Sequence, residues 1–286
     1  MRHDDEGRHP HGDGVRPGAI ALYEEVLRGQ TAPLALRTAD GRALPLQVSR
    51  WCGRPDAADE ELLRHCLGPV LDVGCGPGRL TIALTERGIP ALGVDISRAA
   101  VARVRQAGAA ALHCSVFDPL PGQGRWETVL LADGNIGIGG RPAGLLRRCA
   151  QLLAPGGRLL IEADPGDVDE RITARLEHPD GRRGPVFPWA RMGTAAVLRA
   201  AAGAGLDVTR QWRHANRAFV CAAASAAAKR RATLDRRFRA RTTARSEENL
   251  CRTDRGSPAG PWHLRCRYQV TALADLFAPW ERSPLD

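Results

Sequence analysis

The stretch VLDVGCGPGRLTIALTERGIPALGVDIS, residues 70–97, decides the fold of this 286-residue chain. It opens with a short apolar run at residues 70–73, which is typical of a buried strand in a parallel sheet. Gly74, Gly76 and Gly78 follow directly. Because glycine has no Cβ atom, it adopts unusual backbone dihedrals and lets a ligand approach the main chain closely. The sequence therefore predicts a strand that ends in a tight, glycine-rich turn.

The second half of the stretch predicts a helix, a second strand and an acid at the end of that strand. Residues 80–87 carry apolar side chains at helical spacing, and residues 91–94 form the next apolar run. The turn thus presents the free N–H groups of a helix N-terminus to a polar ligand. Asp95 follows the second strand about twenty residues after Gly74, where a carboxylate can accept hydrogen bonds from a ribose diol.

Two kinds of ligand suit this arrangement: a dinucleotide, or a nucleoside with a short charged tail. The dinucleotide fingerprint is G-x-G-x-x-G, whereas here the pattern is G-x-G-x-G and Arg79 stands where the third fingerprint glycine belongs. Asp72, just before the turn, would repel a pyrophosphate but would suit an ammonium group. A ligand with an amino-acid end and an adenosine end satisfies both Asp72 and Asp95.

The stretch resembles the first two motifs of the class I S-adenosylmethionine-dependent methyltransferases. The resemblance implies that the D-V-G-C-G-P-G turn holds the methionine part of the cofactor S-adenosylmethionine and that the acid after the second strand holds its ribose. Members of this family commonly carry an acid after the third strand, predicted here at residues 111–116, to bind the adenine amino group. Ser115 occupies that position, and Asp118 is the alternative if the register is shifted by a few residues.

The predicted fourth strand, residues 126–132, is followed by a polar turn at residues 133–137. This turn is expected at the same edge of the sheet as the glycine turn. In open α/β sheets the ligand crevice lies beyond the carboxyl ends of the strands. Asp133 and Asn135 are therefore candidates for contacts to the methyl donor and the acceptor. The alternative is that these residues form a polar loop that only shapes the turn. The candidate catalytic residues are Asp133, Asn135 and His214, and Glu162 is a further candidate base. The predicted cofactor-binding residues are Asp72, Gly74, Cys75, Gly76, Gly78, Asp95, Ile96, Ser115, Val116, Phe117, Asp133 and Gly134.

The predicted fold class is α/β: a doubly wound, mostly parallel seven-stranded sheet that closes with an antiparallel hairpin, at residues 205–214 and 217–224. The Leu-x-Pro-Gly-Gly-x-Leu run that begins at Leu153 also resembles this family. Residues 165–190 are predicted to form an irregular insertion, because they contain several prolines, glycines and charges.

Four segments are predicted along the chain. Residues 1–17 form a disordered N-terminus, and residues 18–55 form a cap with a short helix and an Asp-Gly hairpin. Trp51 in this cap faces substrate or anchors the core. Residues 56–227 form the S-adenosylmethionine-binding domain. Residues 228–286 form a basic, arginine-rich, loosely ordered extension, with a lid, a dimer contact or an RNA-binding tail as alternatives.

Composition limits the other functions. The net charge is +9, and residues 229–286 hold 13 basic and 7 acidic residues, so that +6 of this excess lies in the extension. The N-terminus has no apolar signal-peptide region, and no apolar run is long enough for a membrane span, which predicts a cytoplasmic protein. The eight cysteines include no Cys-x-x-Cys pair. Cys251, His263 and Cys266 lack a fourth metal ligand, so no metal is expected.

The acceptor is predicted to be a small molecule. The turn at residues 133–136 does not resemble the Asp/Asn-Pro-Pro-Tyr/Phe pattern of enzymes that methylate amide or exocyclic nitrogens. No Pro-Cys dipeptide is present for cytosine methylation, and few aromatic residues are available to stack on bases. The alternatives are a non-catalytic domain that binds the cofactor or a partner, and an RNA methyltransferase that grips RNA through its basic tail.

Overall fold

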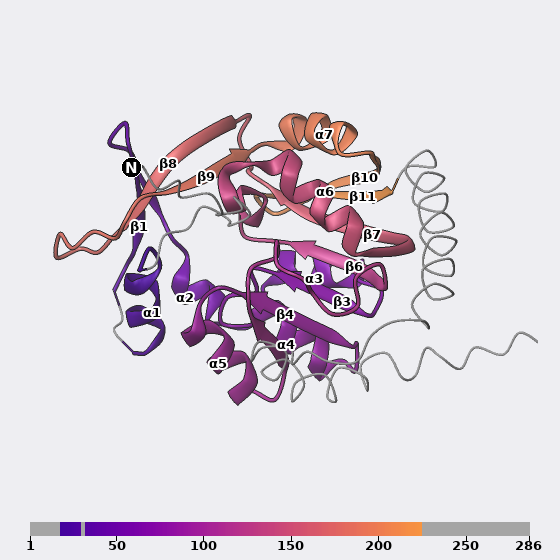
Figure 1. Cartoon of the computed structure of the whole chain (residues 1–286), viewed down its shortest axis with the longest axis horizontal. Helices are drawn as coiled ribbons and strands as arrows, with labels where there is room; N and C mark the ends of the chain where they lie inside the picture. Colours follow the sequence, from indigo (N-terminus) through magenta and orange to yellow (C-terminus); the bar gives the residue numbers. More distant parts are fainter. Residues whose placement is uncertain (1–17, 30–31, 225–286) are drawn as a thin grey trace, which may run out of the picture.

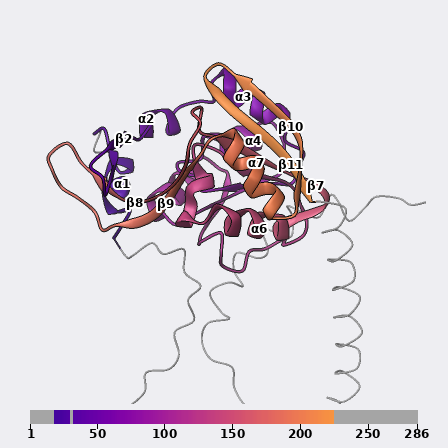
Figure 2. The ribbon, with the colours of Figure 1, turned by 90° about the horizontal axis from the view of Figure 1, so that it is seen from above.

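The computed structural model describes residues 18–29 and 32–224. The predicted disordered N-terminus and the predicted basic extension, residues 228–286, lie outside these residues. The described chain forms two sheets that lie side by side along the long axis of the molecule (Figures 1 and 2). One sheet has seven strands and the other has four.

The seven-stranded sheet confirms the predicted doubly wound fold. Its order is β10-β11-β7-β6-β3-β4-β5, with β3 to β7 parallel and with β11 antiparallel to both β7 and β10. From β3 the chain runs outward through β4 and β5, and then returns to β6 on the other side. The crevice for a ligand therefore lies at the carboxyl ends of β3 and β6. The strands are β3 (Val70–Val73), β4 (Ala91–Asp95), β5 (Ala110–His113), β6 (Trp126–Leu131), β7 (Leu153–Ala163), β10 (Leu206–His214) and β11 (Arg217–Ala224).

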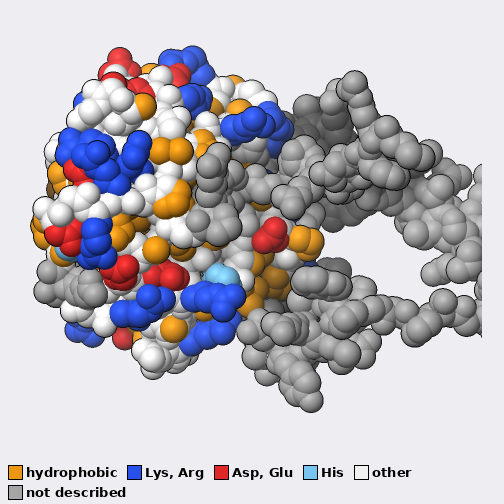
Figure 3. All heavy atoms as spheres, turned by 60° about the vertical axis from the view of Figure 1, so that its left-hand side comes forward, with side chains coloured by type: hydrophobic (Ala, Val, Ile, Leu, Met, Phe, Trp, Pro, Cys, Tyr) orange, Lys and Arg blue, Asp and Glu red, His pale blue; other side chains and the backbone are white. Residues whose placement is uncertain are grey.

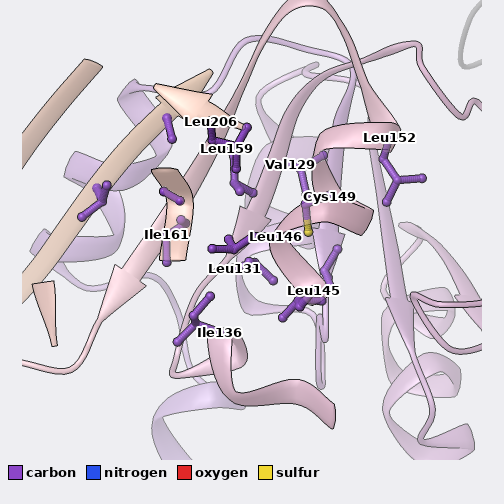
Figure 4. Close-up of a cluster of buried hydrophobic side chains, with 14 of the residues drawn as sticks. Val129, Leu131, Ile136, Leu145, Leu146, Cys149, Leu152, Leu159, Ile161 and Leu206 are labelled. Atoms are coloured by element: carbon purple, nitrogen blue, oxygen red, sulfur yellow. The ribbon is translucent and has the colours of Figure 1, made fainter. Parts of the chain in front are cut away.

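Helices cover both faces of this sheet. Leu71 and Val73 point to the core shared with α6 and α7, whereas Val70 points to the core shared with α3 and α4. Successive side chains of a strand point to opposite faces, so Asp72 lies on the α4 face. Figure 4 shows the core between β6, β7 and α6, where Leu131 and Leu146 are fully buried. The helices are α3 (Ala57–Arg64), α4 (Arg79–Glu86), α5 (Arg98–Gln106), α6 (Pro142–Leu152) and α7 (Thr194–Gly203).

The four-stranded sheet corrects the prediction of an irregular insertion at residues 165–190. Its order is β2-β1-β8-β9, and Leu36 of β1 pairs with Leu176 of β8. Alternate residues of β8, Ile172, Ala174 and Leu176, pack into one cluster with α1, so the segment has the period of a half-buried strand. The elements are α1 (Ala21–Leu27), β1 (Ala35–Thr38), β2 (Ala43–Pro45), α2 (Val48–Trp51), β8 (Asp169–Glu177) and β9 (Phe187–Met192).

We call residues 18–51 and 169–192 together the cap. The cap contains strands from both sides of the predicted boundary between residues 55 and 56. This boundary therefore does not separate the two sheets. A 3-10 helix, η1 (Asn135–Gly140), joins the cap to the larger sheet. A Cβ atom on Gly137 would lie only 2.2 Å from the backbone oxygen of Ala190 on β9. The backbones are this close because residue 137 is glycine.

Charges are mixed on the face shown in Figure 3. Basic side chains form several separate groups there, with acidic and apolar atoms between them. No helix among the described residues is long and apolar enough to cross a membrane.

Candidate functional site

The glycine turn joins β3 to α4, and its three glycines have different roles. All have positive φ, at +70°, +54° and +98°. A Cβ atom on Gly74 would lie 2.8 Å from the amide nitrogen of Asn135, and one on Gly78 would lie 2.6 Å from Val104 of α5. For a Cβ atom on Gly76, the only atom within 4 Å among the described residues, apart from the adjacent ones, is the phenol oxygen of Tyr23, at 3.1 Å. Gly74 and Gly78 therefore allow close packing, whereas Gly76 leaves space in front of the turn.

Asp95 contacts the turn directly at the carboxyl end of β4. Its Oδ2 accepts a hydrogen bond from the Gly76 N–H at 2.8 Å, and its Oδ1 accepts one from the Ser97 N–H at 2.7 Å. Burial raises the pKa of the Asp95 carboxyl above its usual value. The two motifs that the sequence predicted to act together therefore meet in space.

Asp72 lies behind the turn and is 2% exposed. Its Oδ2 accepts a hydrogen bond from the hydroxyl of Thr81 at 2.7 Å. Burial raises the pKa of Asp72 to about 7, although the Thr81 bond acts in the opposite direction. A cationic group brought to this carboxylate would stabilise its ionised form.

The segment after β5 brings Ser115, and not Asp118, to the cavity described below, and the adenine contact stays a prediction. Ser115 and Val116 line the cavity described below, as does Cys114. Asp118 does not line it; its carboxylate accepts the N–H of Ser115 at 3.0 Å and so fixes the local turn. Phe117 packs against the hydrophobic core instead of the cavity.

Asn135 holds the glycine turn in place. Its side-chain Nδ2 donates hydrogen bonds to the backbone oxygens of Val73 and Gly74, each at 2.9 Å. These two carbonyls lie at the end of a buried strand, where an unpaired polar group would cost free energy. Asn135 thus joins η1 to β3.

Asp133 lies in a network of arginines. It has a positive φ of +55°, and its N–H donates to Glu162 at 2.8 Å. One carboxylate oxygen accepts from Arg50 at 2.6 Å and the other accepts from Arg79. Both oxygens of this candidate catalytic residue are therefore occupied by guanidinium groups.

The same network includes Asp59 of α3, a helix that covers the seven-stranded sheet. This carboxylate is fully buried and pairs with Arg79, with Arg50 at 3.1 Å and with Arg217 at 2.7 Å. Arg217 of β11 also pairs with Glu162 of β7. No motif in the sequence indicated this network, because its members are spread over residues 50–217 and come together only in the folded chain.

These residues surround a cavity of about 250 Å³ between the glycine turn and the cap. Cap residues that the motifs did not identify, Tyr23, Phe187 and Trp189, form part of its wall, and so do Trp51 and Arg79. The structure does not place Gly78, Phe117, Gly134 or His214 on this wall. The predicted cofactor-binding residues that line it are Asp72, Gly74, Cys75, Gly76, Asp95, Ile96, Ser115, Val116 and Asp133.

Two other chemical features of the described residues bear on the predictions. The six described cysteines are free thiols. No group of three or more His, Cys, Asp or Glu residues in the described ranges is placed to hold a metal ion. Cys251, His263 and Cys266 lie outside those ranges.

The wall of the cavity fits the chemistry of S-adenosylmethionine. This molecule carries an ammonium group, a carboxylate, a sulfonium and a ribose diol, so its net charge is positive and it also presents hydroxyl donors. Asp72 and Asp95 offer carboxylates near the turn, and the space in front of Gly76 would be reduced by any side chain at that residue. The residues present are therefore compatible with this cofactor.

Comparison with known proteins gives the same assignment. The model of the methyltransferase domain family matches residues 37–211, which is more than half of the chain. The ubiquinone biosynthesis O-methyltransferase of Pseudomonas paraeruginosa is 35% identical over 101 residues, which are 32% of this chain and 42% of that protein. The enzyme of the same name from Pseudomonas aeruginosa is 34% identical over the same shares. The match thus spans about two fifths of the length of these relatives.

A solved structure supports the fold. The S-adenosylmethionine-dependent methyltransferase from Bacteroides fragilis, crystallised with S-adenosyl-L-homocysteine, superposes with a TM-score of 0.61 at 21% identity. The superposition covers 73% of this chain and 94% of that one. The chain therefore belongs to the methyltransferase domain family and has the Rossmann-like class I fold of the S-adenosylmethionine-dependent enzymes.

Proposed function

We propose that this chain transfers the methyl group of S-adenosylmethionine to a small-molecule acceptor. The observation that carries the proposal is the hydrogen bond between Asp95 and the N–H of Gly76, which holds the acid and the open turn together beside the cavity. The family match supports the same reaction. A cytoplasmic location remains a prediction from the sequence.

In this proposal, different cavity-lining residues contact different parts of S-adenosylmethionine. Asp95 accepts hydrogen bonds from the ribose hydroxyls, and Asp72 faces the methionine amino group. Ser115 and Val116 contact the adenine ring. Tyr23 adds a hydroxyl from the cap, which faces the open side of Gly76.

The reaction requires positioning more than acid–base chemistry. S-adenosylmethionine supplies an electrophilic methyl group: the acceptor forms a bond to that carbon, and the carbon–sulfur electrons stay on sulfur. The protein has to hold the two reactants in line. Among the residues that line the cavity, the three carboxylates already accept hydrogen bonds, Asp72 from Thr81, Asp95 from two backbone N–H groups and Asp133 from arginines.

We therefore propose no protein base for the reaction. Asp133 and Asn135 act as positioning residues, because one holds the arginine network and the other holds the turn. His214 ends β10 and pairs with Arg217 across the hairpin, away from the cavity wall. An acceptor that loses its proton to water, or has none to lose, suits this site. The names of the Pseudomonas relatives support an oxygen acceptor.

Calorimetric titration tests the proposal. The protein is titrated with S-adenosylmethionine, with S-adenosylhomocysteine and with NADH. We expect micromolar binding of the first two and no binding of NADH. Binding without methyl transfer to any member of a small-molecule acceptor panel would favour the non-catalytic alternative. Binding of NADH alone would contradict the proposal.

A further inference from the structure

The cavity has two walls of different chemistry. Its four charged lining residues, Asp72, Arg79, Asp95 and Asp133, come from the start of α4 and from the carboxyl ends of β3, β4 and β6 or the residues just after them. The eight lining residues that come from the cap are all aliphatic or aromatic. A ligand that lies against the cap therefore meets no charge there.

Aromatic side chains are concentrated on the cap wall. The described chain has eight aromatic residues, and four of them line this cavity: Tyr23, Trp51, Phe187 and Trp189. The other four are Phe117, Trp126, Trp212 and Phe219. The cavity residues form two edge-to-face pairs, Tyr23 with Trp51 at 6.2 Å and Phe187 with Trp189 at 6.3 Å between ring centroids. Flat rings offer flat surfaces to a flat ligand.

A second cavity, of about 580 Å³, opens from the same region. Trp51 and Trp189 line both cavities, so they stand where the two meet. The second cavity has six charged lining residues, and these form three ion pairs: Arg50 with Asp133 at 2.6 Å, Arg191 with Asp164 at 2.8 Å, and Arg217 with Glu162 at 2.6 Å. Each charge in it already has a partner of opposite sign.

A charged acceptor that entered the second cavity would thus lose its water shell without gaining a free counter-ion. Burial of an unpaired charge is strongly unfavourable, whereas an uncharged ring loses little on leaving water and gains contact area. From these features we propose that the acceptor is an uncharged, planar aromatic compound that binds against Trp51 and Trp189, with its reacting atom toward the glycine turn. This inference rests on the proposed methyl transfer and adds the class of acceptor.

Three matched probes test the class of acceptor. The protein is saturated with S-adenosylhomocysteine and titrated calorimetrically with 2-naphthol, with 6-hydroxy-2-naphthoate and with decahydro-2-naphthol. The second probe adds a negative charge, and the third removes the planar rings. We expect 2-naphthol to bind at least about tenfold more tightly than either. Equal or tighter binding of the naphthoate or of the decahydro compound would overturn the proposal.

Variants test the place of binding. Trp51→Leu and Trp189→Leu should each weaken 2-naphthol binding about fivefold or more, and by a larger factor than they weaken S-adenosylhomocysteine binding. Trp212→Leu is the control, because Trp212 stacks on Phe219 at 5.3 Å and lines neither cavity. Unchanged 2-naphthol affinity in both cavity variants would contradict the inferred position.

The titration is repeated without S-adenosylhomocysteine, so that the two proposals fail separately. Absence of S-adenosylhomocysteine binding together with retained 2-naphthol selectivity would contradict the methyl-transfer proposal alone. Normal S-adenosylhomocysteine binding without that selectivity would contradict only the proposed acceptor class.

Discussion

The phenol oxygen of Tyr23 lies 3.1 Å from the point that a Cβ atom on Gly76 would occupy. Tyr23 belongs to α1 in the cap, and Gly76 belongs to the turn after β3, so this approach closes the cap over the turn. Burial, together with the nearby charge of Asp95, raises the pKa of the Tyr23 hydroxyl well above its usual value. The hydroxyl therefore remains protonated and can donate a hydrogen bond.

Substitution of Gly76 should abolish donor binding. In Gly76→Val the branched side chain would fill the space in front of the turn and meet the Tyr23 hydroxyl. We expect the affinity for S-adenosylmethionine, measured by calorimetry, to fall at least about a hundredfold. Gly88→Val is the matched control, because Gly88 also has a positive φ, of +70°, but a Cβ atom there would meet no atom of the described part of the chain within 4 Å. Equal losses in the two variants would mean that backbone strain, and not the lost space, is responsible.

Removal of the Tyr23 hydroxyl should have a smaller effect. Tyr23→Phe keeps the ring and its edge-to-face contact with Trp51. Because a single hydrogen bond contributes about 0.5–1.5 kcal/mol, we expect donor affinity to weaken about two- to tenfold. The melting temperature without ligand should change little. Unaltered affinity would show that the hydroxyl does not contact the donor.

Asp72 should make both stability and donor binding depend on pH. Its pKa is about 7 in the folded protein, against a usual value of 3.8, so the folded chain holds a proton that the unfolded chain has lost between about pH 4 and pH 7. The stability of the ligand-free protein should therefore fall as the pH rises through this window. Donor affinity should change in the opposite direction, because an ammonium group binds the ionised carboxylate.

The variant Asp72→Asn tests both effects. Melting curves from pH 5 to pH 8 should be flatter in the variant than in the wild type, and its melting temperature at pH 8 should be higher. Its affinity for S-adenosylmethionine should be lower and less dependent on pH. Asp207→Asn, at an exposed position on β10, is the control and should match the wild type in both measurements. Parallel pH profiles in Asp72→Asn and the wild type would show that another group titrates.

The buried pair of Asp59 and Arg79 should be costly to break on one side only. Both side chains are almost fully buried, at 0% and 2% exposure. Asp59→Ala leaves the Arg79 guanidinium with one carboxylate fewer, and we expect the free energy of unfolding to fall by about 3–5 kcal/mol. Adding Arg79→Met should restore part of that loss, as measured in a double-mutant cycle by urea unfolding. Simple addition of the two single losses would show that the residues are not coupled.

The glycine turn and its contact with Asp95 could be predicted from the sequence because the features that specify them are local. The glycines, the first strand and Asp95 lie within residues 70–97, and each has a clear backbone or charge requirement. Ser97 is a similar case: serine is a favoured N-cap residue, and its hydroxyl accepts a hydrogen bond from the N–H of Ala100 at the start of α5. Such features depend on neighbours a few residues away, so they can be found in a single sequence.

The cap could be predicted only in part. The Asp-Gly hairpin is local, and the structure confirms it as β1 and β2. Its third strand is β8, whose Leu176 pairs with Leu36 across 140 residues of chain. The alternation of Ile172, Ala174 and Leu176 was a usable signal, but the surrounding prolines, glycines and charges outweighed it. Nothing in the spacing of Phe187 and Trp189 indicated that they face the cavity.

The pairing of β1 with β8 has a consequence for redesign of the cap. The cap side of the cavity, where we propose that the acceptor binds, is built from two stretches of chain that flank residues 52–168 in sequence. Exchange of the N-terminal stretch alone with that of a relative would leave β8 with a mismatched neighbour, since Leu36 and Leu176 would no longer be selected together. A chimaera with altered specificity therefore needs two coordinated grafts, and natural divergence of specificity should proceed through paired changes in these strands.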